Sequence, residues 1–586
     1  MTSPPPLEVW APAATSVDVD LPGEGRRTPL RPIGDGWWRG PALAPGTDYA
    51  FRLDGGPARP DPRSPWQPVG VHGPSRTFDP DLGRPPAWPG VDARGAVTYE
   101  LHVGTFTPRG TLDAARTRLD HLAGLGVQVV ELMPVAEFSG RHGWGYDGVD
   151  LYAVHHAYGG PAALQRFVTA AHEHGIGVCL DVVYNHLGPA GNYLAEFGPY
   201  FTDRHATPWG EAVNLDGPGS GPVRRFFVEN ALRWVADFGV DALRLDAIHA
   251  LVDDSPRHLL AELADDVDAL ARRLGRPVTL VAESDLNDVR VVTPTAAGGL
   301  GMHAQWADDV HHALHAFMTG ERQGYYVDFG TVPVLEHALR EPFVHQGTYS
   351  TYRERHWGAE VPANVDGHAF TVFASNHDQV GNRGLGDRPS ATLTDGALAV
   401  ELALVLLGHY TPMLFMGEEW AARTPWRFFT DHPDPDLADA VREGRTEEFA
   451  RFGWDEMYGD DAEVPDPQAP ETFAASRLDW HERDRPENAR VLAFVRDLVA
   501  LRRGTPDLAS GDRARTTVTS DPDGAWLVVG RGGYAVVACL ADGGCAVPVP
   551  GAAARQVLLT WDPVRADGDA VHLPRHGVAV LGPAPA

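Results

Sequence analysis

The hydrophobic pattern changes twice along the chain. From Leu7 to about Gly90, short segments alternate apolar and polar residues and are broken by Pro and Gly, as in LEVWA, SVDVDL and YAFRL. Alternation with period two is typical of half-buried strands, so this part predicts a β-sandwich over residues 1–92. Segments such as AWLVVG and YAVVACL predict a second β-sandwich over residues 505–586.

Between these two parts, residues 93–504 alternate apolar, strand-like runs with amphipathic helical stretches. The eight runs are VTYELHV, VQVVELMPV, IGVCLDVVY, VDALRLDAI, VTLVAES, GMHAQW, FTVFASNHD and PMLFMGEEW. Continuous apolar strands, each followed by a helix, predict an α/β fold closed into a (β/α)8 TIM barrel. The helix after the fifth run has no clear counterpart in the pattern.

Two insertions interrupt the predicted barrel, at residues 185–221 and 421–486. The second insertion is rich in Asp, Pro and aromatic residues. We expect it to be a long loop with a functional role, because long loops without secondary structure are uncommon in compact domains.

Composition narrows the classes of function. The 586 residues are 43% hydrophobic and 22% charged, which is typical of a globular protein with a large core, and the formal net charge is −30. That charge argues against nucleic acid and anionic membranes as partners and favours a neutral ligand. No segment resembles a signal peptide or a membrane span, so we expect a cytoplasmic protein.

The cysteine content also favours a cytoplasmic protein. Three cysteines in so long a chain indicate a reducing compartment, and they fit no zinc spacing. Cys539 and Cys545 could pair, but separate buried thiols are the preferred interpretation. The histidine pairs His155–His156 and His311–His312 also lack metal spacing, and we expect them on solvated helix faces and caps.

Three carboxylates stand at the carboxyl ends of predicted barrel strands, where such barrels carry their active sites. Asp246 follows the fourth strand, Glu283 the fifth and Asp378 the seventh. A single Asp at a strand end is usually a cap or a turn residue. Further polar residues converge on the same rim, which favours a site: Asp181, Asn185, His186, Arg244 and His377.

The stretch GVDALRLDAIHA suggests the chemistry of that site. Arg244 and Asp246 share one face of an apolar strand, and burying such a pair is costly unless it is used. The arginine would keep Asp246 ionised and nucleophilic, whereas desolvation and negative neighbours would raise the pKa of Glu283 and make it a proton donor. Two carboxylates in these two roles suit glycoside hydrolysis.

Aromatic residues fit a sugar ligand. The segment HGWGYDGVD places Trp144 and Tyr146 in the loop after the second strand, where either ring could stack on a pyranose. Packing in the core is an equally good interpretation of each aromatic residue taken alone.

At this point the motifs resemble those of a known family. DVVYNH, ALRLDAIHA, VAES and SNHDQVGN are similar, in this order, to the four recurring regions of the α-amylase family of retaining glycoside hydrolases. The resemblance covers the whole chain. It implies that Asp246 is the nucleophile, Glu283 the general acid/base and Asp378 the transition-state stabiliser. It also implies that the −1 sugar site is lined by Arg244, His186, His377, Tyr146 and Asp181.

Other stretches resemble the members of that family that act on malto-oligosyltrehalose and related α-glucans. These stretches are YELHVGTFTPRGTL, AQWADDVHHALHAFMTGERQGYY, FMGEEW and RFFTDHPDP. Such enzymes use water as co-substrate to cut the α-1,4 bond beside a terminal trehalose unit. Candidates for gripping the trehalose side are His249, Asp285, Tyr352, Arg353, Glu419 and Asp431.

We expect no metal and no cofactor, because the insertion after the third strand is short of carboxylates. Alternatives remain open: a 1,4-α-glucan branching enzyme, a general α-amylase or debranching enzyme, or a non-catalytic glucan-binding protein. The intact carboxylate trio argues against the last of these. A retaining mechanism predicts a separation of about 5–5.5 Å between the Asp246 and Glu283 carboxyls.

Overall fold

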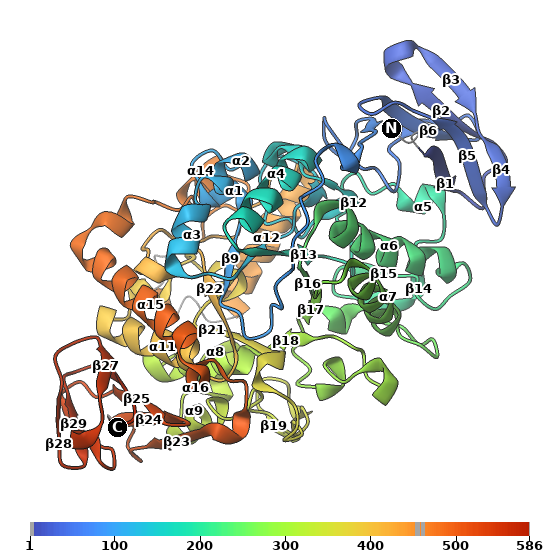
Figure 1. The fold of residues 1–586 in the computed structure, drawn as a ribbon. Coiled ribbons are helices and arrows are strands. Elements are labelled where there is room, and N and C mark those ends of the chain that lie inside the picture. The colour runs from blue at the N-terminus through green and yellow to red at the C-terminus, as the bar shows by residue number, and fades with distance from the viewer. Residues whose placement is uncertain (1–4, 452–456, 459–462, 585–586) are drawn as a thin grey trace.

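The computed structural model describes residues 5–451, 457–458 and 463–584. A central barrel lies between two small β domains, which sit at opposite ends of the elongated molecule (Figure 1). The N-terminal domain comes first in the chain, and the C-terminal domain follows the last barrel helix. No helix in the described parts of the chain is long and apolar enough to cross a membrane.

Eight parallel strands close into the barrel, which confirms the predicted fold class. Every residue of these strands is buried, and this is why the runs are largely apolar instead of alternating. Each of the eight predicted runs supplies one strand: β9 (Thr98–Leu101), β10 (Val129–Leu132), β13 (Gly177–Val182), β16 (Ala242–Leu245), β17 (Thr279–Ala282), β18 (Ala304–Trp306), β21 (Phe370–Phe373) and β22 (Thr411–Phe415).

Helices cover the outside of the barrel, and they follow the predicted amphipathic stretches: α2 (Leu112–Arg116), α3 (Leu119–Leu125), α4 (Gly160–Glu173), α6 (Ser220–Phe238), α7 (Leu259–Leu274), α8 (Asp308–Thr319), α11 (Asp395–Leu407) and α15 (Pro486–Gly504). Between β17 and β18 the chain forms only the short 3-10 helices η5 (Val289–Val291) and η6 (Thr295–Ala297). The helix that the pattern did not reveal is therefore absent from that connection.

Two sheets form the N-terminal domain. One contains β1 (Pro6–Trp10), β5 (Trp37–Ala42) and β4 (Arg31–Gly34). The other contains β3 (Arg26–Pro29), β2 (Val17–Leu21), β6 (Asp48–Leu53) and β7 (Ala58–Arg59), with β8 (Ser75–Arg76) paired to β6. The domain packs on the first insertion, where the Trp10 ring lies edge-on to Tyr200 with centroids 5.6 Å apart.

Two sheets also form the C-terminal domain. The larger contains β23 (Thr516–Ser520), β24 (Trp526–Arg531), β25 (Tyr534–Cys539), β30 (Val578–Leu581) and β27 (Val557–Thr560), and the smaller β26 (Cys545–Pro548), β29 (Ala570–Leu573) and β28 (Arg565–Asp567). Cys539 and Cys545 are joined in a disulfide, so the expectation of separate thiols was wrong. The tight connection from β25 to β26 brings the two residues together.

Both insertions contain regular structure. The first holds α5 (Leu194–Phe197) and the hairpin of β14 (Phe201–Thr207) and β15 (Gly210–Val213). The second was expected to be a loop, but it contains α12 (Pro435–Arg451) and α14 (Pro470–Ala475). Proline opens both helices, a position that it favours, so Pro-rich composition misled the prediction. Residues 452–456 and 459–462 of this insertion lie outside the described residues.

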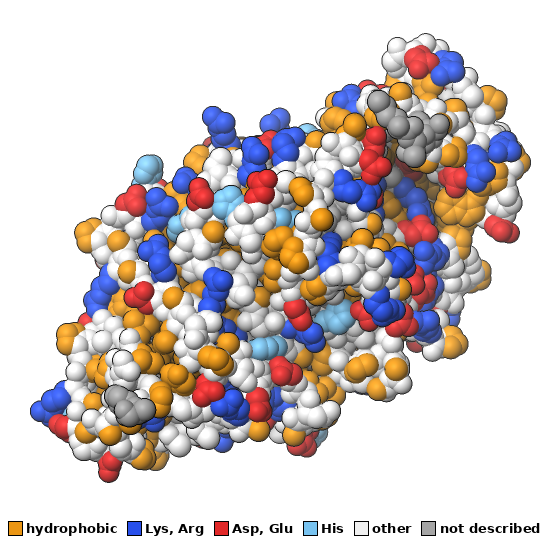
Figure 2. Space-filling model, viewed as in Figure 1, with side chains coloured by type: hydrophobic (Ala, Val, Ile, Leu, Met, Phe, Trp, Pro, Cys, Tyr) orange, Lys and Arg blue, Asp and Glu red, His pale blue; other side chains and the backbone are white. Residues whose placement is uncertain are grey.

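The surface carries both signs of charge. On the face shown in Figure 2, acidic and basic side chains are interspersed, without a broad patch of one sign. This distribution gives a polyanion no extended basic surface on that face.

Candidate active site

Asp246 and Glu283 come side by side because neighbouring parallel strands end at the same rim. The Asp246 amide donates to the Val182 carbonyl (3.1 Å), and the Glu283 amide donates to the Leu245 carbonyl (2.9 Å). These bonds continue the barrel ladders one residue beyond β16 and β17. Asp378 reaches the same region from α10 (His377–Gly381), which follows β21.

Arg244 connects the carboxylates at the centre of the site. Its Nη1 lies 2.7 Å from Asp181 and 3.0 Å from Asp246, and its Nη2 lies 2.9 Å from Glu283. The guanidinium is fully buried, and its carbon lies 4.2 Å from the centre of the Trp306 ring. The buried charge is therefore paired with three carboxylates and covered by an aromatic face.

Hydrogen bonds distinguish Asp246 from Glu283. Asn185 donates to Oδ2 of Asp246 (2.7 Å), and Arg244 donates to Oδ1 (3.0 Å). Burial raises the pKa of Asp246, whereas Arg244 and the Asn185 hydrogen bond lower it. On balance the pKa of Asp246 is raised, so its expected ionisation depends on these two donors. Burial also raises the pKa of Glu283, Arg244 opposes that rise and the Asp246 charge adds to it, as the proposed proton donor requires.

The backbone after the nucleophile candidate has an unusual conformation. Ala247 has φ +37° and lies in the left-handed region, which residues other than glycine rarely adopt. Its N–H donates to Oε2 of Glu283 (2.7 Å). Strain of this kind persists where the surroundings over-determine it, and here it aims a donor at the proposed acid/base. An alanine in the sequence gives no sign of this role.

His377 links the rim to the first barrel strand. Its Nε2 lies 2.7 Å from the Tyr146 hydroxyl, which donates to Asp181 (2.7 Å). Its Nδ1 lies 2.5 Å from Oε1 of Glu100. Burial lowers the pKa of His377, but the carboxylates of Asp378 and Glu100 outweigh burial and raise that pKa to about 10. His377 is therefore an imidazolium at neutral pH.

Asp378 is the most accessible of the three carboxylates. Its side chain is 34% exposed, and Oδ2 lies 3.4 Å from Nε2 of His377. Asn382 donates to its Oδ1 (3.2 Å). These contacts leave it facing open space at the rim, where a sugar could approach.

Sequence reasoning missed two carboxylates of this region. Glu100 lies within the apolar strand β9 and contacts His377. Asp308 follows β18, and burial together with the charges of Glu283 and Asp378 raises its pKa well above the usual value. A carboxylate inside or directly after an apolar strand was the available signal, and it is the same signal that revealed Asp246.

Trp144 does not offer its ring to a ligand as expected. It is only 6% exposed, stacks on Trp426 with ring centroids 5.5 Å apart and donates its indole N–H to the Arg427 carbonyl (3.0 Å). The packing of the 426–428 segment covers the ring. Trp144 is therefore a core residue, and the expectation that it stacks on a sugar is replaced.

Two trehalose-side candidates contact other parts of the protein. Glu419 is fully buried, where it accepts from the Tyr99 hydroxyl (3.1 Å) and contacts His121 (2.8 Å), so it cannot grip a sugar. Asp431 accepts the Arg141 amide (2.7 Å) and thereby anchors the loop that precedes Trp144. Burial removes Glu419 from the candidates, whereas the Asp431 side chain is 39% exposed and remains one.

The other trehalose-side candidates gather around Asp285. Arg353 contacts its carboxylate at 2.9 Å, and His249 lies 3.8 Å from it. Trp357 donates to the Asp285 carbonyl (2.8 Å). Tyr352 is 47% exposed, and its ring centre lies 5.8 Å from the Arg353 guanidinium carbon. The structure therefore brings these candidates together in a polar, partly exposed group. Its central residue, Asp285, directly follows Glu283 and Ser284 in the chain.

His186 has a more enclosed setting. It contacts Asn185 and stacks on Trp209 with ring centroids 4.5 Å apart. Burial lowers its pKa, so the neutral form is favoured. A neutral ring beside Asn185 can hydrogen-bond a sugar hydroxyl without adding charge to the site.

Two groups among the described residues have the composition of a metal site: Glu137 with His155 and His156, and His205 with Asp216 and Asp254. In the first, Nδ1 of His156 lies 2.6 Å from Glu137, a hydrogen-bond distance, whereas neither ring nitrogen of the buried His155 has a hydrogen-bond partner among the described residues. His155 and His311 are buried, which corrects the expectation of solvated histidine pairs.

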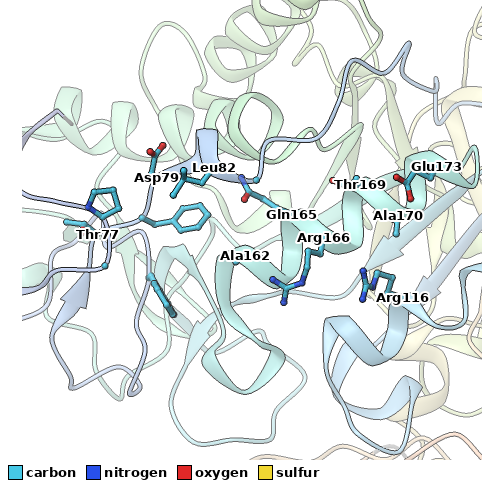
Figure 3. Close-up of a pocket in the computed structure, with 15 residues that line it drawn as sticks. Thr77, Asp79, Leu82, Arg116, Ala162, Gln165, Arg166, Thr169, Ala170 and Glu173 are labelled. Carbon is cyan, nitrogen blue, oxygen red and sulfur yellow. The ribbon is translucent and has the colours of Figure 1, made fainter. Parts of the chain in front are cut away.

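A cavity of about 660 Å³ lies away from the carboxylates, between the N-terminal domain and α4 (Figure 3). Phe78 and Trp66 line it together with Gln165 and Arg166 of α4. Arg166 is paired with Asp113 at 2.6 Å. We interpret this cavity as the junction between two domains.

Comparison with known proteins agrees with this geometry. The model of the α-amylase catalytic domain matches residues 84–205. A malto-oligosyltrehalose trehalohydrolase of Rhizobium sp. (strain M-11) is 50% identical over 585 residues, which cover 98% of this chain and 97% of that protein. This chain belongs to the malto-oligosyltrehalose trehalohydrolase family. Another member, from Arthrobacter ramosus, is 51% identical over 587 residues, with 98% of each chain covered.

The similarity to one solved structure extends over the whole fold of this trehalohydrolase family member. A putative α-amylase from Salmonella typhimurium is 38% identical, with a TM-score of 0.88 over 98% of this chain and 97% of that one. Membership of the trehalohydrolase family makes the protein a glycoside hydrolase of the α-amylase family. The rim of polar residues described above is therefore its candidate active site.

Proposed function

We propose that the protein hydrolyses the α-1,4-glucosidic bond next to the terminal trehalose unit of malto-oligosyltrehalose, releasing trehalose and a malto-oligosaccharide. The observation that carries this proposal is the identity of about half of all residues, over nearly the full length, to named malto-oligosyltrehalose trehalohydrolases. The rim supplies the two carboxylates that glycoside hydrolysis needs.

The proposed reaction has two displacements. Asp246 attacks the anomeric carbon, and Glu283 gives its proton to the glycosidic oxygen as the carbon–oxygen bond breaks. Trehalose leaves with that proton, and a glycosyl ester remains on Asp246. Water then gives a proton to Glu283 and attacks the same carbon, which releases Asp246 and yields the malto-oligosaccharide with retained configuration.

Fixed charges and hydrogen-bond donors support each step. Arg244 and Asn185 hold the two oxygens of Asp246 in place for attack. The Ala247 amide holds one oxygen of Glu283. Asp378 and the His377 imidazolium would hydrogen-bond the hydroxyls of the distorted sugar, and such bonds strengthen as oxocarbenium character develops.

The group around Asp285 would bind the trehalose side. Asp285 follows Glu283 by two residues in the chain, which places the group near the bond that Glu283 would protonate. Arg353 and Asp285 supply donors and acceptors for hydroxyls, and the exposed Tyr352 ring supplies an apolar face.

Product analysis tests the proposal. Purified protein is incubated separately with maltopentaosyl-trehalose, maltohexaose and amylose, and the products are separated by chromatography, with Asp246→Asn as the inactive control. Free trehalose from the first substrate and slow attack on the others is the expected result. Equal attack on maltohexaose would indicate a general α-amylase, and branched or longer products from amylose would indicate a branching enzyme.

A further inference from the structure

Glu100 directs its whole carboxylate at one residue of the site. It lies in β9, is 1% exposed and accepts the backbone N–H of His377 at Oε2 (3.0 Å). Its Oε1 lies 2.5 Å from Nδ1 of the same histidine. The two residues are 277 positions apart and meet because β9 and β22 close the barrel beside β21.

This contact determines which protons His377 carries. Nδ1 must donate to the Glu100 carboxylate, because a carboxylate only accepts. On the other side of the ring, the Tyr146 hydroxyl uses its proton on Asp181, so it presents a lone pair to Nε2 at 2.7 Å. The Asp378 carboxylate also faces Nε2, at 3.4 Å. A ring nitrogen without hydrogen would be repelled by both oxygens, whereas an N–H attracts them.

We propose that Glu100 is a positioning residue of the hydrolysis: it holds His377 doubly protonated, with Nε2–H turned toward Asp378 and the sugar. The inference deepens the proposed function and rests on its catalytic rim, but not on which leaving group the enzyme prefers. Other charged or titratable groups also face His377 from the surrounding elements: Asp378, Asp181, Arg244, Glu283, His102 and Tyr146.

Without the Glu100 charge, two changes are expected. The ring loses the acceptor that fixes its orientation, and burial together with the nearby Arg244 charge favours the neutral form. A neutral His377 would present to Asp378 either a lone pair or an N–H whose orientation is no longer fixed. The result is a slower reaction that recovers when acid restores the proton.

The chain offers a matched control. Glu131 lies in β10, is directly paired with Glu100 in the register of the two strands and is also buried. Burial raises the pKa of Glu131 to about 8, so it is largely neutral at pH 7 and glutamine is a close substitute. Its carboxylate makes no hydrogen bond to His377 in the part of the chain that the structure describes.

The experiment compares Glu100→Gln with Glu131→Gln on α-maltotriosyl fluoride, from pH 5 to 8. Fluoride leaves without general-acid help, and the substrate contains no trehalose unit, so this readout is independent of trehalose specificity. We expect Glu100→Gln to lose about 30-fold or more in kcat/KM at pH 7.5 and to recover most of it at pH 5. Glu131→Gln should stay within about threefold of the wild type throughout.

Two further variants separate positioning from folding. Glu100→Asp keeps the charge and should lower the rate without adding pH dependence. In a His377→Asn background, Glu100→Gln should cause no further loss, because its effect passes through the ring. A loss that is independent of pH, or that persists in the His377→Asn background, would overturn the proposal. Wild-type turnover of the fluoride without trehalose release would instead count against the proposed function alone.

Discussion

At the scale of residues, the site has an imbalance of charge: the single positive charge of Arg244 faces three carboxyl groups. Asp181, Asp246 and Glu283 all lie within 3.0 Å of its guanidinium nitrogens. One cation cannot hold three buried anions equally, so burial still raises the pKa of each carboxyl. The hydrogen bonds of the two carboxyls differ: Asn185 and Arg244 donate to the two oxygens of Asp246, and the Ala247 amide donates to Glu283. We infer the different roles of Asp246 and Glu283 from these contacts.

Azide distinguishes these two roles. In Glu283→Ala, azide can enter the space of the lost acid/base and attack the glycosyl ester on Asp246, so an α-glycosyl azide is expected from α-maltotriosyl fluoride. In Asp246→Ala, azide replaces the nucleophile on the opposite face and should yield a β-glycosyl azide. Proton NMR of the products reads the configuration. The same anomer from both variants would contradict the assignment.

At the scale of elements, α11 carries an unusual buried acid. Burial raises the pKa of Glu401 to about 8, and the charge of Glu418 adds to the rise. Oε2 of Glu401 has no hydrogen-bond partner among the described residues. The apolar helix therefore packs a neutral carboxyl against the barrel, a feature that affects stability instead of catalysis.

The dependence of the free energy of unfolding on pH should reveal the protonation of Glu401. Between its unfolded pKa of about 4.5 and its folded pKa of about 8, the unfolded chain is ionised at Glu401 while the folded chain keeps the proton. The free energy of unfolding therefore falls as pH rises through this window. Glu401→Gln should remove this loss and gain on the order of 3 kcal/mol over the wild type between pH 5 and 8.

Thermal unfolding at several pH values measures the difference between the variant and the wild type. The exposed Glu487→Gln on α15 is the control and should show a constant, small difference. If the Glu401→Gln difference were equally constant across the range, Glu401 would not be protonated in the folded protein.

The hairpin of β19 (Thr348–Ser350) and β20 (Arg355–Trp357) carries the predicted trehalose contacts in its turn. Arg353→Ala removes the cation held by Asp285 and should lower kcat/KM on maltopentaosyl-trehalose about tenfold, the equivalent of about 1.4 kcal/mol. The rate on maltohexaose should change less. The ratio of the two kcat/KM values checks the prediction.

Arg355→Ala is the matched control for that ratio. Arg355 lies on the same hairpin and stacks on Trp357, 4.5 Å from the ring centre, and among the described residues it forms no ion pair with Asp285, unlike Arg353. Its removal should leave the ratio unchanged. If Arg353→Ala lowered both rates equally, Arg353 would act on the hairpin as a whole and not on substrate choice.

At the scale of the whole molecule, the N-terminal domain braces the first insertion. Trp10 is buried against Tyr200, and a side chain at Gly198 would collide with its ring. Arg63 forms an ion pair with Glu229 of α6, which extends the interface to the barrel. The first insertion also supplies Trp209 beside His186, so the domain supports one wall of the site.

Trp10→Ala should therefore weaken more than its own domain. Removing a buried tryptophan costs about 3–5 kcal/mol, and we expect the temperature of activity loss to fall by several degrees. Thermal inactivation and the unfolding transition should shift together. The exposed Leu82→Ala is the control. Unchanged inactivation in Trp10→Ala would show that the N-terminal domain unfolds independently of the site.

The strands and the order of the rim carboxylates could be predicted because they depend on local pattern. A parallel strand buried on both faces is largely apolar, so eight such runs stood out, and the charged pair Arg244 and Asp246 was visible against one of them. The helix α12 and the disulfide were not predicted, because a Pro-rich helix start gives a weak local signal and the pairing of Cys539 with Cys545 depends on the connection from β25 to β26.

The sequence by itself thus determined the barrel, its two flanking β domains and the identity of Asp246, Glu283 and Asp378 as candidates. Only the tertiary structure decided that Glu100 holds His377, that the Ala247 amide points at Glu283 and that Trp144 is buried. The physical reason is the same in each case. Barrel closure joins residues hundreds of positions apart, and packing around them imposes a backbone conformation and a burial that no local pattern of residues encodes.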